Sequence, residues 1–335
     1  MPKRAAINER SAVKRTLRTI IPAMVLFALG FALVSIYIGM DRVITPMAQI
    51  GWVLVLALLG LSLVNYGLRT VRWMIFNRNL SIPITPLDAL ITYFCGFALQ
   101  MTPMKAGEAL RLWLIAKRYR IGYQRLVPLL LVDKLYDSIG LYLMAVIGSL
   151  SFVDYQTLFY IVGILLGIKI FLFLNPKYLY STIGLFFRLT LRKKKRFWAG
   201  ARASFRGAEK LLTWKVFIPS LILTIVGWLA EIYAFSKILA AMQSTISMAK
   251  LGFIFTFSTG TGAITLSPGG LGGVELTMQK LLTVLDVPEG VALASVLIIR
   301  LTTLWFAVIL GMLILPIALR RAKNPVTIMP HLSGH

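Results

Sequence analysis

The sequence predicts an all-α polytopic membrane protein whose two halves form an inverted repeat, with about six transmembrane helices and two re-entrant helical hairpins. Of the 335 residues, 58% are hydrophobic and 14% are charged, a balance that soluble domains do not have. Several apolar runs approach the roughly 20 residues that a helix needs to cross a bilayer. Two interrupted apolar segments stand at corresponding places in the two halves, a pattern that points to a transporter's binding site.

The charge pattern predicts topology and excludes several function classes. The chain has 36 Lys and Arg against 12 Asp and Glu, a formal net charge of +24. These bases stand between apolar runs, as in cytoplasmic loops, and motifs for nucleic acid are absent, so we expect no nucleic-acid partner. The only cysteine, Cys95, excludes an intrachain disulfide. No His, Cys or carboxylate cluster has metal-ligand spacing, so we expect no metal and no cofactor.

A single transmembrane domain is expected over 19–320, between a basic segment at 1–18 and a tail at 321–335. Both flanks carry bases, which predicts cytoplasmic termini in a multi-pass protein of the cell (inner or plasma) membrane. The repeat halves are expected at about 19–174 and 216–318, and the basic segment between them, 175–215, is expected to be a cytoplasmic connector.

The first half contains a hairpin between simple spans. We end the second span at 68 because Arg69, Arg72 and Arg78 follow it. The segment 86–122 is too short for two helices that each cross about 30 Å, and both of its flanks are basic. We therefore expect a re-entrant hairpin with its tip at 102–107; a simple transmembrane pair is the competing interpretation. The spans of this half are expected at 19–40, 47–68, 126–150 and 157–174.

The second half repeats this order. A span at 216–240 contains Glu231, which has no obvious local partner. The apolar segment 251–285 is broken at 267–273, and an acidic loop follows it, which predicts a hairpin that enters from outside. The last span, 290–318, returns to a basic tail.

Both breaks have a hydroxyl residue, a proline, glycine and a lone glutamate. Backbone groups freed inside lipid need partners, so such breaks are tolerated where they line a wet cavity. The hydroxyl residues suit the N-cap and the prolines the first helical turn, which predicts helix starts near mid-membrane whose N–H groups suit a phosphate. A single break would be explained as well by small residues that let helices pack closely, whereas two matching breaks favour a binding site. The segments are Thr102-Pro103-Met104-Lys105-Ala106-Gly107-Glu108 and Ser267-Pro268-Gly269-Gly270-Leu271-Gly272-Gly273-Val274-Glu275.

Each glutamate is followed by an intramembrane charge 25 residues later, Asp133 after Glu108 and Arg300 after Glu275. Asp133 and Asp137 share a helix face, so they repel unless one binds a cation or a proton. An unpaired arginine at mid-membrane costs at least about 2.5–3.5 kcal/mol, so we expect Arg300 to face the bundle interior against Glu275, Asp133 or Asp137. A buried structural ion pair is the alternative to a functional role.

The predicted site binds a lipid headgroup and contains no catalytic residue. Glycines allow close approach of the backbone to a phosphate, while Lys105 supplies a point charge and Arg111 a bidentate fork. The predicted residues are Thr102, Pro103, Lys105, Gly107, Glu108, Arg111, Asp133, Asp137, Ser267, Pro268, Gly269, Gly270, Gly272, Glu275 and Arg300.

At these residues the chain resembles the lysylphosphatidylglycerol synthase transmembrane family, a flippase-like membrane module. The resemblance covers roughly 15–320 and implies a lipid-translocating module. In two-part members this module moves an aminoacylated phosphatidylglycerol made by an attached cytosolic synthase. Because the chain ends at His335, we expect a stand-alone member that is not an enzyme; such members resemble phospholipid or polyprenyl-phosphate carriers of cell-envelope glycolipid pathways. The resemblance rests on Pro103 with Gly107, Glu108 and Arg111, on Asp137, on Ser267 to Gly272 with Glu275, and on Arg300.

We therefore expect a flippase that moves an anionic phospholipid or a polyprenyl-phosphate-linked lipid between leaflets, with the phosphate at the two broken-helix tips. Its expected partners are membrane lipids and a separate synthase or glycosyltransferase. A non-catalytic scaffold or regulator of a lipid- or glycan-modifying synthase is the alternative. A lipid-headgroup transferase with Glu108 or Glu275 as general base has less support, because no activated nucleophile accompanies them.

Overall fold

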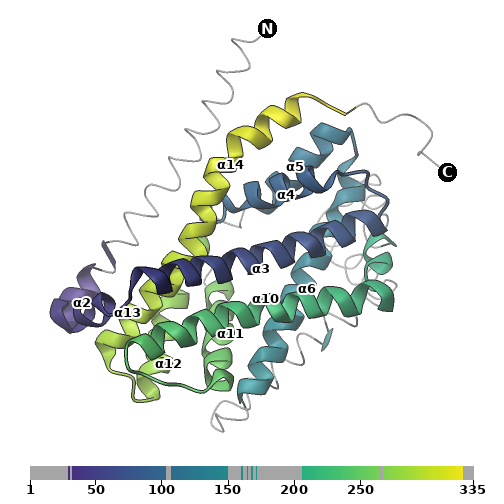
Figure 1. Cartoon of the computed structure of the whole chain (residues 1–335). Coiled ribbons are helices and arrows are strands. Elements are labelled where there is room, and N and C mark those ends of the chain that lie inside the picture. Colours follow the sequence, from purple (N-terminus) through teal and green to yellow (C-terminus); the bar gives the residue numbers. More distant parts are fainter. Residues whose placement is uncertain are drawn as a thin grey trace, which may run out of the picture.

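The computed structural model describes residues 29–149 except 31 and 103–106, residues 206–326 except 265 and 266, and isolated positions between 160 and 171. The predictions for 1–18, for the span 157–174 and for most of the connector and the tail lie outside these residues. Every regular element in the described ranges is helical (Figure 1). The elements are α2 (Met40–Ala48), α3 (Trp52–Asn79), α4 (Pro86–Phe97), α5 (Gly107–Tyr119), α6 (Tyr123–Ser149), α10 (Trp214–Ala241), α11 (Met248–Ile264), a 3-10 turn (Pro268–Gly270), α12 (Gly273–Val284), α13 (Glu289–Arg300), a π-helical turn (Leu301–Trp305) and α14 (Phe306–Lys323).

Three helices in the described part are long and apolar enough to cross a membrane. They are α3, α10 and the continuous segment Glu289–Lys323, which joins α13, the π-helical turn and α14. The predicted span at 126–150 corresponds to α6, which is 27 residues long and buries Asp133 and Asp137. These two aspartates lower the hydropathy of α6, but their side chains lie inside the bundle.

The predicted end of the second span at 68 is wrong. Helix α3 begins at Trp52 and continues for 28 residues to Asn79. The side chain of Arg72 is 0% exposed, so this residue lies inside the bundle and does not mark an aqueous loop. The interior of the bundle tolerates this buried arginine because it forms ion pairs, which are described with the site below.

Helices α3 and α10 lie side by side and antiparallel (Figure 1). Arg72 donates a hydrogen bond to Thr224 Oγ1 over 2.5 Å, and Asn65, two turns earlier on α3, donates to Glu231, two turns later on α10. Gly227 allows this approach, because a Cβ atom there would lie 2.6 Å from the side-chain oxygen of Asn65. The helix pair thus forms one wall of the interior.

The short helices α4 and α5 pack against each other in antiparallel orientation. At one end, a Cβ atom on Gly107 would lie 1.9 Å from the carbonyl oxygen of Gly96. At the other end, Tyr119 Oη donates to Asp88 over 2.5 Å. The segment 86–122 therefore contains two short helices on either side of 102–107, and they form a tight pair.

The α4–α5 pair and the α11–α12 pair approach the middle of the segment Glu289–Lys323 from opposite ends. Helix α12 packs along α13, whereas α4 and α5 pack along α14. The two interrupted regions meet beside the π-helical turn, because a Cβ atom on Gly269 would lie 2.3 Å from Met101 Sδ and 3.5 Å from Leu304. The breaks, distant in sequence, are thus adjacent in space.

Asp88, in the first turn of α4, binds the far ends of two other helices. Its carboxylate accepts hydrogen bonds from Arg118 Nε at 2.5 Å and from Arg321 Nε at 2.6 Å. Asp88 is 1% exposed. It thereby connects the start of α4 to the end of α5 and the end of α14.

We expect Asp88→Asn to destabilise the protein by about 1.5–3 kcal/mol, because it removes hydrogen bonds in which both partners are charged. The change keeps the size and shape of the side chain. Detergent-induced unfolding followed by circular dichroism would measure the free energy of unfolding. The control is Asp286→Asn, at an exposed residue with φ of 62°, a conformation that asparagine also adopts. Equal stability of the two variants would contradict the role assigned to Asp88.

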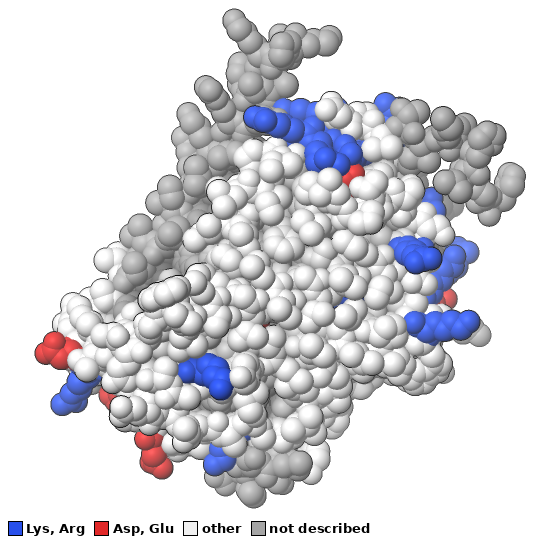
Figure 2. All heavy atoms as spheres, viewed as in Figure 1, with Lys and Arg blue, Asp and Glu red and all other residues white. Residues whose placement is uncertain are grey.

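Exposed charges gather toward two ends of the molecule, and one of these ends is strongly basic. Figure 2 shows most Lys and Arg along the top and right of the view, whereas Asp and Glu lie together with a few Lys and Arg at the lower left and bottom; most of the surface between is uncharged. Large exposed apolar side chains such as Leu56, Ile222 and Leu313 belong to the helices that run between these ends. Exposed bases include Arg78, Lys117, Arg120, Arg125, Lys215 and Arg320, and exposed acids include Asp41, Asp286 and Glu289.

Candidate functional site

A cavity of about 810 Å³ lies between the α3–α10 wall, α6 and the two interrupted regions. It brings together most of the charged residues that the sequence predicted. Thr102, Ser267, Gly272 and Glu275 do not line it, although Glu275 contacts a residue that does. Pro103 and Lys105 lie outside the described residues, as does the side chain of Pro268. The predicted residues in the lining are Gly107, Glu108, Arg111, Asp133, Asp137, Gly269, Gly270 and Arg300.

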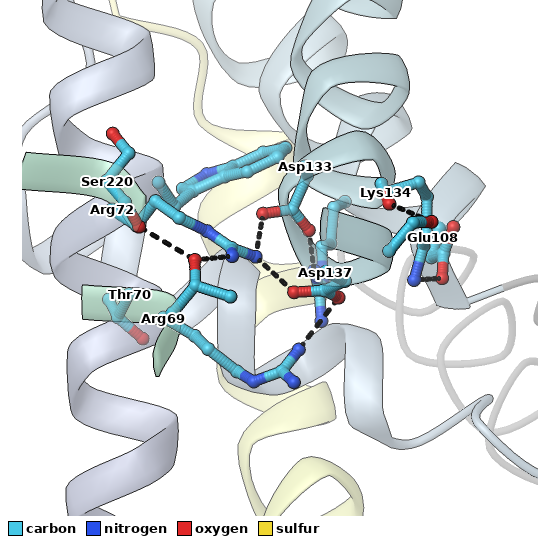
Figure 3. A network of polar contacts seen from close by, with 12 residues as sticks. Arg69, Thr70, Arg72, Glu108, Asp133, Lys134, Asp137 and Ser220 are labelled. Carbon is cyan, nitrogen blue, oxygen red and sulfur yellow. Dashed lines mark hydrogen bonds and ion pairs between the residues drawn. The ribbon is translucent and has the colours of Figure 1, made fainter. Parts of the chain in front are cut away.

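Two arginines of α3 neutralise the two aspartates of α6 (Figure 3). Arg72 reaches Asp133 at 2.6 Å and Asp137 at 2.8 Å, and Arg69 reaches the other oxygen of Asp137 at 2.9 Å. The predicted repulsion between the aspartates is thus relieved by arginine. In a low-dielectric interior such pairing is what permits buried charge.

Glu108, the acid of the first break, forms its ion pair with Lys134 on α6 (Figure 3). The side chains of this pair are 23% and 41% exposed, more than those of the arginine–aspartate network. The spacing of 25 residues led from Glu108 to Asp133, which is itself an acid and cannot form an ion pair with it. The partner is one residue beyond Asp133, because the packing of α5 on α6 sets which residue of α6 faces Glu108.

Arg111 is the least completely neutralised arginine of the cavity. Its guanidinium lies 3.8 Å from the centre of the Tyr93 ring. The distance to the carboxylate of Asp133 is 3.9 Å, which is long for an ion pair. Among the described residues its Nε has no hydrogen-bond partner. Gly96 provides the space, since a Cβ atom there would lie 2.2 Å from Arg111 Nε. The arginine is therefore held in place by an aromatic ring and a glycine rather than by a close carboxylate.

At the second break, Arg300 and Glu275 form a direct ion pair with an N–O distance of 2.6 Å. Glu275 is thus the partner among the three that were expected. Arg300 also donates to the carbonyl oxygen of Gly269 at 2.8 Å, so it binds the break itself. The pair fixes the loop at 267–273 to the start of the π-helical turn.

The predicted N-cap Ser267 is wrong, because the N-cap residue of α12 is Gly272. The prediction for Thr102 depends on residues 103–106, which lie outside the described part of the chain. Thr102 Oγ1 donates to the carbonyl oxygen of Leu99, and Ser267 Oγ donates to that of Leu271. Helix α12 begins only at Gly273, after glycines with φ values of 64° to 82° at 269, 270 and 272. The backbone N–H of Gly272 donates to the carboxylate of Glu275 at 2.7 Å. The chain's own carboxylate therefore occupies the helix start that suited an anion.

Sequence reasoning missed several residues that line the cavity or lie directly behind it. Asn65, Arg69 and Arg72 are spaced by four and three residues, so they share one face of α3. That spacing could have indicated a polar helix face. It was overlooked because arginines that follow an apolar helix usually mark a cytoplasmic loop. Glu231 now has a partner, since it accepts a hydrogen bond from Asn65. Trp228 completes the set, with the Arg69 guanidinium 4.6 Å from its ring centre.

Comparison with known proteins agrees with the resemblance seen in the sequence. The family model described as the lysylphosphatidylglycerol synthase TM region matches residues 19–311. The chain is also similar to the UPF0104 membrane protein of Methanothermobacter thermautotrophicus (strain Delta H), with 22% identity over 316 residues, which cover 88% of this chain and 94% of that protein. The matched range contains both breaks and Arg300. The chain is thus a membrane protein that belongs to the lysylphosphatidylglycerol synthase transmembrane-region family.

Proposed function

We propose that this protein is a flippase that moves an anionic phospholipid or a polyprenyl-phosphate-linked lipid between leaflets, with the headgroup phosphate bound in the cavity. The observation that carries the proposal is that one cavity adjoins both breaks and contains Arg111, an incompletely paired arginine. Transporter sites built from interrupted helices have this character. A separate synthase or glycosyltransferase is the proposed supplier or user of the lipid.

The phosphate binds at the first break, beside Arg111, and not at the start of α12. The guanidinium of Arg111 offers planar, bidentate donors that match phosphate oxygens. Lys134 and Glu108 lie in the same lining and are the more exposed ion pair, so they can exchange partners with a headgroup that carries both charges and hydroxyls. At the second break, Arg300 is already bound to Glu275 and to Gly269.

In the proposed topology the α4–α5 pair and the α11–α12 pair are the two re-entrant hairpins of an inverted repeat. They enter the membrane from opposite sides. The basic end, which contains Arg321 and the far ends of α4 and α5, faces the cytoplasm, as the positive-inside rule expects. The opposite end, with Asp286 and Glu289, faces outward. Because the tips meet at the π-helical turn, rocking of one pair against the other would expose the cavity to alternate sides.

Flip assays in reconstituted vesicles test the proposal. The purified protein should accelerate movement of labelled phosphatidylglycerol or of labelled polyprenyl phosphate. Arg111→Gln should slow it about ten- to a hundredfold, because a charged hydrogen bond to the phosphate is lost. Lys117→Gln, an exposed base on the same helix, should leave the rate unchanged. Equal rates with and without protein for both lipid classes would overturn transport, and a scaffold would give that result.

A further inference from the structure

The charged groups that line the cavity cancel. Among the described residues the lining has four cationic and four anionic side chains, and the two residues directly behind it, Arg72 and Glu275, add one of each sign. A lipid phosphate that enters adds a negative charge inside low dielectric, which is costly unless a positive charge accompanies it. The cationic residues are Arg69, Arg111, Lys134 and Arg300, and the acidic residues are Glu108, Asp133, Asp137 and Glu231.

Three of these four carboxylates are held by a cation. Glu108 is paired with Lys134, Asp133 with Arg72, and Asp137 with Arg69 and Arg72. Glu231 differs, because in the part of the chain that the structure describes its hydrogen-bond partner is the neutral amide of Asn65. Glu231 is 7% exposed. It is therefore the lining acid that can accept a proton without breaking an ion pair.

The neighbours of Glu231 are held by other contacts, so they leave its carboxylate available to bind a proton. Arg69 donates to Asn65 Oδ1 at 3.0 Å and to Asp137 at 2.9 Å, and it lies over Trp228. Because the amide oxygen of Asn65 is engaged by Arg69, its amide nitrogen donates to Glu231 Oε1. The second carboxylate oxygen is then the one that takes up a proton.

The charged and titratable groups that face Glu231 come from three helices. They are Tyr66 and Arg69 on α3, Asp137 on α6 and Arg300 on α13. From α11, which also packs on α10, the cavity lining includes Phe255 and Thr256 and no charged residue. Arg69, Asp137 and Arg300 are each engaged in an ion pair or hydrogen bonds of their own. A change of charge in the cavity is therefore taken up most readily at Glu231.

We propose that Glu231 is a proton-binding site that couples lipid movement to a proton gradient. This inference rests on the proposed flippase function. When a phosphate enters the cavity, the Glu231 carboxylate takes up one proton from the side of entry, and it releases that proton when the phosphate leaves on the other side. One singly charged headgroup and one proton then cross together, and the cycle moves no net charge.

The test uses vesicles that contain labelled phosphatidylglycerol, which has one negative charge, with either a pH gradient or a potassium diffusion potential. Wild-type protein should enrich the lipid in one leaflet by up to about tenfold for a gradient of one pH unit, and the potential should have no effect. Glu231→Gln keeps the shape and a hydrogen bond to Asn65. It should still equilibrate lipid, lose the response to pH and become sensitive to the potential. Glu209→Gln, at an exposed carboxylate outside the cavity, should behave as wild type.

Infrared spectroscopy supplies a readout that does not depend on transport. Addition of short-chain phosphatidylglycerol to the purified protein should produce the carbonyl band of a protonated carboxylic acid, and Glu231→Gln should abolish it. Glu231→Asp, which keeps an ionisable group, should keep the pH response even where Glu231→Gln folds poorly. Lipid flip that ignores the pH gradient in wild type, or a band that persists in Glu231→Gln, would overturn the inference and leave the flippase proposal standing. Absence of any flip would overturn the flippase proposal itself.

Discussion

Replacing Arg72 with methionine should destabilise the protein by about 3–5 kcal/mol. The side chain is 0% exposed and bridges Asp133 and Asp137, so its loss leaves buried carboxylates without their closest cation. Methionine fills a similar volume, so the loss of charge dominates over the loss of packing. Titration with denaturing detergent, followed by circular dichroism, would give the free energy of unfolding.

Two further variants separate charge from packing at this position. Arg78→Met, at an exposed residue near the end of the same helix, should change stability by less than about 0.5 kcal/mol. Adding Asp133→Asn to Arg72→Met removes one of the orphaned charges, so it should restore part of the lost stability. If the double variant is less stable than Arg72→Met alone, the uncompensated carboxylate is not the cause.

Gly107→Ala should be the most disruptive change at the first break. The added Cβ would lie 1.9 Å from the carbonyl oxygen of Gly96, and a backbone carbonyl cannot rotate away as a side chain can. Overpacking costs typically about 1–3 kcal/mol, and we expect the upper end of that range, with α4 and α5 forced apart. The matched control is Gly122→Ala, where the added atom would have nothing within 4 Å.

The chain provides its own probe of this separation. Cys95 is its single cysteine, is 0% exposed and directly precedes Gly96 on α4. In Gly107→Ala the thiol should react with a small membrane-permeant thiol reagent faster than in wild type or in Gly122→Ala. Unchanged thiol reactivity together with unchanged stability would mean that the helix pair does not need the close contact at Gly107.

The parts of the fold that follow from local sequence were predictable. Apolar runs indicated a helical membrane protein, and the two proline–glycine breaks with their glutamates indicated where the helices are interrupted. The pair of Glu275 with Arg300 was among the expected contacts, because an arginine inside a span needs a carboxylate within reach. These inferences depend on composition and spacing along one segment of chain.

The contacts that depend on how helices face one another were not predictable in the same way. Nothing in the sequence near Glu108 indicates that its partner is Lys134, because the two residues lie on different helices and the packing of α5 on α6 brings them together. Arg72 was assigned to a loop because the positive-inside rule reads bases as loop markers, and the rule fails where a base is buried with an acid from another helix. The N-cap was misplaced at Ser267 because three glycines with positive φ stand between it and the start of α12.

The π-helical turn Leu301–Trp305 has a geometric effect on the whole bundle. Each residue of an α-helix advances the azimuth by about 100°, so the wider turn rotates α14 relative to the direction that α13 would otherwise give it. In this continuous helix Arg300 can then point toward the polar interior while Gly311 faces the backbone of Ala98. The α4–α5 pair and the α11–α12 pair thus contact faces of the same long helix that point in different directions. The five residues of the π-helical turn set the angle between these two faces.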